Sequence, residues 1–98
     1  MEFLEELNFS KEAIKKIIDN NSNIDLYELS SNGTDVSKII EYFREIGISD
    51  DTIVDMLINI NYIFFRDLDD IKKSLSSENI EEVADIVNGD YLSIEEYI

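Results

Sequence analysis

Apolar residues recur along the chain at the three- and four-residue spacing of amphipathic helices, and one such pattern occurs twice. Residues 2–21 read EFLEELNFSKEAIKKIIDNN, and residues 41–60, thirty-nine positions later, read EYFREIGISDDTIVDMLINI. The apolar positions that coincide without a gap are Phe3, Leu4, Leu7, Phe9, Ile14, Ile17 and Ile18 in the first stretch, and Tyr42, Phe43, Ile46, Ile48, Ile53, Met56 and Leu57 in the second. Each stretch therefore predicts two short helices joined by a tight turn.

The two predicted turns carry matching residues. Asn8 and Gly47 occupy the same place, and these two residue types best tolerate the left-handed conformation that follows a helix. Ser10 and Ser49 come two residues later and suit the cap of the next helix, because a serine hydroxyl accepts a hydrogen bond from a free backbone N–H. The sequence thus predicts a left-handed residue and a serine cap in each copy.

The similarity continues beyond the second helix of each copy. Ile24, Leu26 and Leu29 of the first copy correspond to Ile63, Phe65 and Leu68 of the second. A third short helix or an extended segment is expected there. The alternation of apolar and polar residues over 58–62 also fits a short strand, so residues 58–65 stay open between helix, loop and strand.

The segment between the two copies, SSNGTD at residues 30–35, is a loop by composition. Thr34 or Asp35 is predicted to cap a helix that runs to Ile46. After the second copy, Ile71 and Leu75 indicate a shorter helix.

The C-terminal part of the chain has the pattern of a truncated third copy. Ser77 is predicted to cap a helix from Glu78 to about Asn88, with Gly89 as the residue that follows its C-terminus. The apolar stripe of this helix consists of Ile80, Val83, Ala84 and Val87. Ser93 and Glu96 then fit the capping box of a final turn.

These elements predict an all-α fold, a small helical-repeat domain that spans residues 1–98. The repeat comprises 2–38 and 41–75, with a partial third copy at 76–98, so about two and a half right-angled helix-turn-helix units are expected. One helical pair of this size cannot bury its apolar face alone, and stacking of the copies is expected to form a continuous core.

The second copy resembles the repeat of the mitochondrial transcription termination factor family. The residues that carry the resemblance are Gly47, Ile48 and Ser49 at the turn and Ile53, Met56 and Leu57 on the second helix, with Asn8, Phe9 and Ser10 as a weaker copy of the turn. The resemblance covers most of residues 2–75 and implies a helical fold. Proteins of the family hold nucleic acid on a surface lined with basic residues and usually carry a proline after the second helix. This chain has no proline and a net charge of −15, so the resemblance does not carry that function across.

The net charge of −15 comes from 23 acidic and eight basic residues. Because such a charge repels phosphate backbones and anionic membranes, we expect neither direct nucleic-acid binding nor membrane binding. The natural complement is a protein partner with a basic or mixed surface. The oligomeric state stays open.

Residues for catalysis or metal binding are scarce. The chain has no histidine and no cysteine, which excludes the common Ser–His and Cys–His arrangements and thiolate metal sites. A calcium loop starting at Asp67 fails, because Ile71 and Lys72 stand at its fifth and sixth positions. The paired carboxylates lie on predicted polar faces and are Asp50/Asp51, Asp69/Asp70, Glu81/Glu82 and Glu95/Glu96. We expect no catalytic residue, no metal and no cofactor.

The start of the chain lacks the basic and apolar regions of a signal peptide, and the apolar run at residues 62–65 is too short to span a bilayer. A cytoplasmic protein is therefore expected. The abundance of Ile, Asn, Asp, Glu and Lys, without proline, fits an AT-rich bacterial or mobile-element genome.

The acidic residues are unevenly distributed, because residues 76–98 hold seven acids and no base. Glu78, Glu82 and Asp85 are predicted to share the helix face opposite the apolar stripe. The candidate partner-binding residues are Glu78, Glu81, Glu82, Asp85 and Asp90. A solvated face without a partner is the simpler interpretation of the same charges.

Three functions follow as hypotheses. The first is a non-enzymatic, acidic helical module for protein–protein interaction. The alternative is a nucleic-acid mimic that inhibits a DNA- or RNA-handling protein, because closely spaced carboxylates release counterions as phosphates do. The third is self-assembly through apolar residues that exceed what a small core needs, namely Tyr62, Phe64, Phe65, Tyr91, Tyr97 and Ile98.

Overall fold

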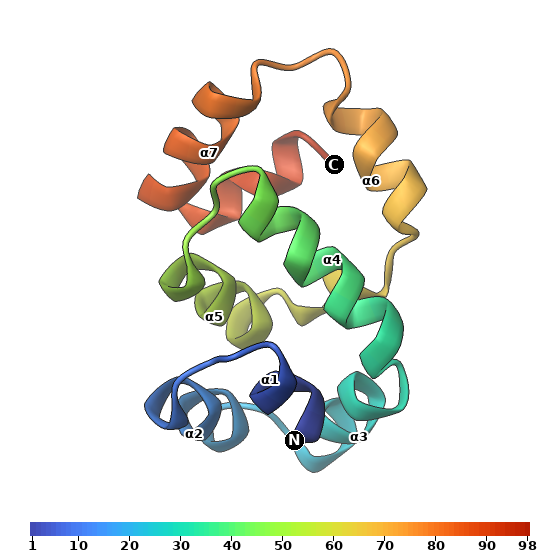
Figure 1. The fold of residues 1–98 in the computed structure, drawn as a ribbon, viewed down its shortest axis with the longest axis vertical. Helices are drawn as coiled ribbons and strands as arrows, with labels where there is room; N and C mark the ends of the chain where they lie inside the picture. Colours follow the sequence, from blue (N-terminus) through green and yellow to red (C-terminus); the bar gives the residue numbers. More distant parts are fainter.

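The computed structural model describes all of residues 1–98 and contains helices but no strand (Figure 1). The all-α prediction is confirmed. The elements in chain order are α1 (Glu2–Glu6), α2 (Lys11–Asp19), α3 (Asn23–Ser31), α4 (Gly33–Glu45), α5 (Asp50–Asn59), the 3-10 helix η1 (Asn61–Phe65), α6 (Leu68–Leu75), α7 (Ile80–Gly89) and the 3-10 helix η2 (Tyr91–Glu96).

Both predicted turns form as the sequence indicates. Asn8 and Gly47 are the two residues with positive φ, at 64° and 101°. Ser10 and Ser49 cap α2 and α5, and each hydroxyl accepts a hydrogen bond from the backbone N–H three residues further on. The predicted left-handed residues and serine caps are therefore confirmed.

The backbone hydrogen bonds of the two turns are also the same. The N–H of Phe9 donates to the carbonyl oxygen of Leu4 at 3.2 Å, and the N–H of Ile48 donates to that of Phe43 at 2.9 Å. These bonds span six residues and define a Schellman motif, in which an apolar residue after the helix contacts one in its last turn. All four side chains are buried, so each turn is held by its own apolar contact.

The predicted loop at residues 30–35 is wrong. Helix α3 continues through Ser31 and α4 begins at Gly33, which leaves Asn32 alone between them, and neither Thr34 nor Asp35 acts as a cap. The side-chain amide of Asn32 donates to the carbonyl oxygen of Glu28 at 2.8 Å and satisfies the end of α3. Helical packing therefore overrides the loop-forming composition of this segment.

Residues 58–65 contain no strand. Residues 58 and 59 belong to α5, and Asn61–Phe65 form the 3-10 helix η1. Ile63 and Phe64 of η1 are fully buried, and the Phe64 ring meets that of Phe43 edge-on, with centroids 5.8 Å apart. Burial of two adjacent side chains against α4 and α5 explains why a compact turn replaces an extended segment.

The start of α7 differs from the prediction. Asn79, and not Ser77, caps this helix, and its Oδ1 accepts a hydrogen bond from the N–H of Glu82 at 3.2 Å. Gly89 is the last residue inside α7 and has no left-handed conformation. Both Ser77 and Asn79 are suitable caps by residue type, so residue type alone does not choose between them.

The final turn also differs from the prediction, because Ser93 lies inside η2. The cap of η2 is Asp90, whose carboxylate accepts a hydrogen bond from the N–H of Leu92 at 3.2 Å. The hydroxyl of Ser93 donates back to the carbonyl oxygen of Asp90 at 2.6 Å. The predicted capping box of Ser93 and Glu96 is therefore wrong.

One core cluster of 22 buried residues runs from Leu4 in α1 to Ile94 in η2. The molecule is elongated, with extents of 36 × 24 × 21 Å. In Figure 1, α2 and α3 lie at one end of the long axis, α6 and α7 lie at the other, and α4 runs between them. The molecule therefore has an N-terminal end (α2 and α3) and a C-terminal end (α6 and α7).

The correspondence of the two copies is limited beyond the turns. Ile24 is 71% exposed on α3, whereas its counterpart Ile63 is fully buried in η1. The segments that hold these residues also differ, because α3 is an α-helix of nine residues and η1 is a 3-10 helix of five. The repeat as a whole stays a prediction.

Candidate functional site

The five candidate acids lie on or beside α7, and all are exposed. Glu81, Glu82 and Asp85 belong to the helix itself. Glu78 lies in the turn before the cap of α7, so the predicted helical set of Glu78, Glu82 and Asp85 is wrong. Asp90 follows α7 and caps η2 with its carboxylate. The acidic face is therefore defined as Glu81, Glu82 and Asp85, with Glu78 and Asp90 flanking the two ends of the helix.

No ion pair involves the acidic face. The ion pairs of the molecule join Lys15 to Asp19, Lys16 to Asp55 and Arg44 to Asp50, far along the chain from α7. Repulsion between Glu81 and Asp85, four residues apart, costs roughly 0.2–0.5 kcal/mol. Glu81 and Glu82 in the first turn recover about 0.3–1 kcal/mol each from the helix dipole. The helix therefore tolerates its acidic face without a bound cation.

Asn88 fixes how α7 sits on the rest of the molecule. Its Nδ2 donates to the carbonyl oxygen of Gly47 at 3.0 Å, and its Oδ1 accepts from the N–H of Ser49 at 2.9 Å. A Cβ atom on Gly47 would lie 3.4 Å from that of Ala84, about an ordinary contact distance, so it is the positive φ of 101° that favours glycine at this turn. Because Asn88 satisfies both backbone groups, it holds the acidic face in one orientation.

Apolar side chains accompany the acids at the C-terminal end. Ile86 is 40% exposed, and it lies four residues after Glu82 and four before Asp90. Leu92, in η2, is 49% exposed. Neither residue was predicted from the sequence. The exposure of Ile86 could have been expected, because it lies outside the apolar stripe of α7.

A hydrogen bond from a tyrosine links η2, the last helix of the chain, to η1. The hydroxyl of Tyr62 in η1 donates a hydrogen bond to the carboxylate of Glu95 in η2. This bond is the largest cause that raises the pKa of Tyr62 above its usual value, and burial adds to it. Of the aromatic residues considered for self-assembly, Phe64 is fully buried, Tyr91 and Tyr97 pack against the core, and Tyr62 and Phe65 remain exposed.

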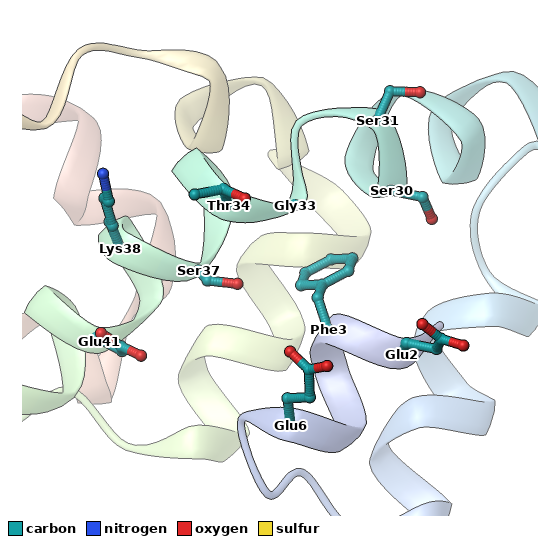
Figure 2. Close-up of a pocket in the computed structure, with 10 residues that line it drawn as sticks. All are labelled: Glu2, Phe3, Glu6, Ser30, Ser31, Gly33, Thr34, Ser37, Lys38 and Glu41. Atoms are coloured by element: carbon teal, nitrogen blue, oxygen red, sulfur yellow. The ribbon is translucent and has the colours of Figure 1, made fainter.

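The largest hollow, about 740 Å³, lies between α1, the end of α3 and the start of α4. Figure 2 shows the Phe3 ring at its centre, with the Glu2 and Glu6 carboxylates on either side of the ring. The Lys38 side chain points away from Glu6 and has no ion pair. The hollow is open and mostly polar, and it brings none of the predicted site residues together.

The interior offers few polar groups. Thr52 is the one buried polar side chain, and its hydroxyl lies 2.9 Å from that of Ser49. No three acidic side chains come close enough to hold a metal ion together. None of the helices is both long enough and apolar enough to cross a membrane.

Comparison with known proteins gives no relative, because no family model, no curated protein and no solved structure matches this chain. The functional argument therefore rests on the side chains of this chain alone.

Proposed function

We propose that the protein is a non-enzymatic, acidic helical module that binds another protein through the acidic face of α7. The observation that carries the proposal is the unpaired charge of residues 76–98. Residues 76–98 hold seven acids and no base, all seven are exposed, and no ion pair involves any of them. A protein partner with a basic surface would be steered to this segment by its concentrated negative charge.

Exposed apolar residues favour a protein partner over nucleic-acid mimicry. Ile86 and Leu92 give the C-terminal end apolar contact area beside Glu82, Asp85 and Asp90. Protein–protein interfaces combine an apolar centre with a charged rim, and this combination suits a basic segment with apolar anchors.

A binding role without catalysis is supported by the absence of any buried acid. Every Asp and Glu side chain is at least partly exposed, whereas a general acid at neutral pH needs burial to raise its pKa. The chain also has no histidine or cysteine to act as base or nucleophile.

Two variants with the same net charge test the proposal. The first carries Glu81→Gln, Glu82→Gln and Asp85→Asn on α7. The control carries Glu2→Gln, Glu5→Gln and Glu6→Gln on α1, at positions that are also exposed. The wild type and both variants are immobilised and used to capture proteins from a lysate of the source organism, with and without added duplex DNA.

We expect proteins that the wild type and the α1 variant retain and that the α7 variant loses. Calorimetry with the identified partner should then show at least about tenfold weaker binding to the α7 variant. Equal loss of captured proteins in both variants would show that only the net charge matters, and would contradict the proposal. Capture of a DNA-handling enzyme that added DNA displaces would favour mimicry.

A further inference from the structure

A single residue, Asn32, separates the helices α3 and α4, and the chain changes direction there (Figure 1). Its backbone angles are φ −105° and ψ 21°. These values lie about 40° and about 60° from those of an α-helix, and no left-handed conformation has to be crossed between them. A modest change in the two dihedral angles of Asn32 would therefore join α3 and α4 into one helix over residues 23–45.

The apolar pattern of the sequence continues through this junction in the register of a single helix. Positions 26, 29, 33, 36, 40 and 43 follow one another at alternating spacings of three and four residues, which places them on one side of a continuous helix. They hold Leu26, Leu29, Gly33, Val36, Ile40 and Phe43, and all except Leu26 are buried. The same sequence is thus compatible with two helices and with one.

The bend leaves backbone groups without partners at the start of α4. The N–H groups of Gly33, Thr34 and Asp35 have no hydrogen-bond acceptor, and no side chain caps this helix. In a continuous helix each of them would donate to the carbonyl oxygen four residues earlier. The bent form is stabilised instead by the side-chain amide of Asn32, which donates to the carbonyl oxygen of Glu28 at 2.8 Å. Straightening would therefore add backbone hydrogen bonds at the junction.

Residues 1–31, the N-terminal unit, pack on the rest of the molecule through contacts that a second copy could provide equally well. Helices α1 and α3 pack on α4, and α2 packs on α5. Arg44 donates to the carbonyl oxygen of Leu7 at 2.5 Å, and Asn21 donates to that of Leu57 at 3.3 Å. The buried side chains of the unit are Leu4, Leu7, Phe9, Ile17 and Leu29. A straight helix over residues 23–45 would move this unit away from its own α4 and α5.

We propose that Asn32 is a hinge through which two copies of this chain exchange their N-terminal units and form a domain-swapped dimer. Residues 23–45 of each chain form one helix in the dimer, and each N-terminal unit packs on α4 and α5 of the other chain. Short connections between elements favour such an exchange. The interface is the packing of the monomer itself, so its strength does not depend on any exposed patch.

Two terms oppose the exchange. Each chain carries a net charge of −15, so two chains repel each other unless salt screens them. Association also removes translational and rotational freedom, which high protein concentration offsets. Because the contacts of the N-terminal unit are the same in both states, the helix propensity of residue 32 should decide how much dimer forms.

Two substitutions at the hinge make a matched pair. Asn32→Ala and Asn32→Gly both remove the amide hydrogen bond to Glu28, which stabilises the bend. Alanine is the best residue inside a helix, whereas glycine is among the poorest. Each dimer contains two hinges, so the difference between the two variants counts twice. The dissociation constant of the dimer should be at least about tenfold lower for Asn32→Ala than for Asn32→Gly.

Crosslinking detects the exchange directly, because the chain has no cysteine. One protein carries Lys16→Cys and a second carries Asp55→Cys, since these side chains join α2 to α5 with charged atoms 3.9 Å apart. Equal amounts of the two are unfolded together in urea and refolded at about 10 μM or about 1 mM protein, in about 500 mM NaCl. A short bismaleimide then links thiols that lie close together.

The pair is prepared with the native Asn32, with Asn32→Ala and with Asn32→Gly. Sedimentation velocity measures the amount of dimer, and far-UV circular dichroism checks that every variant folds. A mixture of the two proteins that were folded separately serves as the control, because exchange requires the N-terminal unit to leave its own chain.

We expect a dimer after joint refolding at the higher concentration, with crosslinks between the Lys16→Cys chain and the Asp55→Cys chain. Its amount should be largest for Asn32→Ala, intermediate for the native residue and smallest for Asn32→Gly. A native sequence that stays monomeric at about 1 mM would overturn the proposal. So would equal amounts of dimer for Asn32→Ala and Asn32→Gly. Crosslinks that form as readily between two Lys16→Cys chains would indicate surface association and would also overturn it.

The exchange goes beyond the function proposed above and does not depend on it. Helix α7 lies outside the exchanged unit, so each dimer would present two acidic faces to its partners. The two proposals fail separately, because the hinge variants test only the exchange and the charge variants of α7 test only partner binding.

Discussion

The two tight turns of the molecule have the same backbone and different supports. The first turn, residues 7–10, joins α1 to α2, and the second turn, residues 46–49, joins α4 to α5. Both have a Schellman motif, a left-handed residue and a serine cap. A polar side chain from further along the chain then holds each turn in place, and these two side chains differ in chemistry.

Arg44 holds the first turn with a charged group. Its Nη1 donates to the carbonyl oxygen of Leu7 at 2.5 Å, and its guanidinium lies 4.5 Å from the centre of the Phe9 ring. Its Nε and Nη2 also donate to the Asp50 carboxylate at 2.7 and 3.1 Å. One side chain thus joins the first turn to α4 and to the start of α5.

Asn88 holds the second turn with a neutral amide, which donates to Gly47 and accepts from Ser49. Local sequence is therefore sufficient to build a turn, whereas the position of the turn in the molecule depends on a distant side chain. We also expect salt to affect the two supports differently, because only the guanidinium is charged.

Alanine substitution of the two left-handed residues should change stability most, and by different amounts. Gly47→Ala should lower the free energy of unfolding by about 2 kcal/mol, because a φ of 101° is strained for any residue with a Cβ. Asn8→Ala should cost about 1 kcal/mol, since φ is 64° there and asparagine already carries a Cβ. Urea unfolding followed by circular dichroism measures both values, and Asn8→Gly serves as a control with little change. Equal costs for the two alanine variants would show that the turns tolerate a Cβ alike.

The next effect concerns the first support. Arg44→Ala should lower the free energy of unfolding by about 1.5 kcal/mol, because it removes a charge-assisted hydrogen bond and leaves the Leu7 carbonyl without its partner. The loss should shrink when urea unfolding is repeated at high salt, since the Asp50 carboxylate is half exposed and screened. A loss that is independent of salt would mean that packing on Phe9 dominates.

The second support should contribute less. Asn88→Ala should lower the free energy of unfolding by about 1 kcal/mol, because two backbone groups lose a neutral partner at a partly solvated site. The same urea titrations should show no dependence of this loss on salt. If Asn88→Ala behaved like Arg44→Ala in salt, the contrast between the two supports would be wrong.

The smallest change in stability concerns the hydrogen bond between Tyr62 in η1 and Glu95 in η2, which belongs to neither turn. The hydrogen bond to Glu95 raises the pKa of Tyr62 in the folded state above that of the unfolded chain, which is about 10. The folded state therefore holds the phenolic proton more tightly, and this contribution is present below pH ~10 and lost as the pH rises through the folded pKa. Tyr62→Phe should remove one late-titrating tyrosine at 295 nm and reduce the loss of stability above that pH. The raised pKa of Tyr42, caused first by burial and then by Glu45, provides an internal control.

The candidate site was predictable in part. The exposure of Glu81, Glu82 and Asp85 follows from their position opposite Val83 and Val87 on an amphipathic helix. The place of Glu78 was not predictable, because both Ser77 and Asn79 can cap a helix. The supporting role of Asn88 depends on a turn about 40 residues earlier in the chain, and no local pattern indicates it.

Features that depend on contacts within about six residues could be predicted from the amino-acid sequence. These are the all-helical fold, the left-handed Asn8 and Gly47, and the serine caps of α2 and α5, because each is set by local sterics and by hydrogen bonds to nearby backbone groups. The net charge and its concentration after residue 76 also follow from the sequence alone.

Which apolar residues are buried could not be predicted from the sequence, because it depends on how the helices pack. Ile24 and Ile63 occupy matching places in the sequence, yet one is exposed and the other is buried. The difference arises because η1 lies between α4 and α5, whereas α3 has its outer side in water. Burial depends on neighbours that the chain brings from a distance, and the same dependence placed Asn32 between two helices and Asn88 on the second turn.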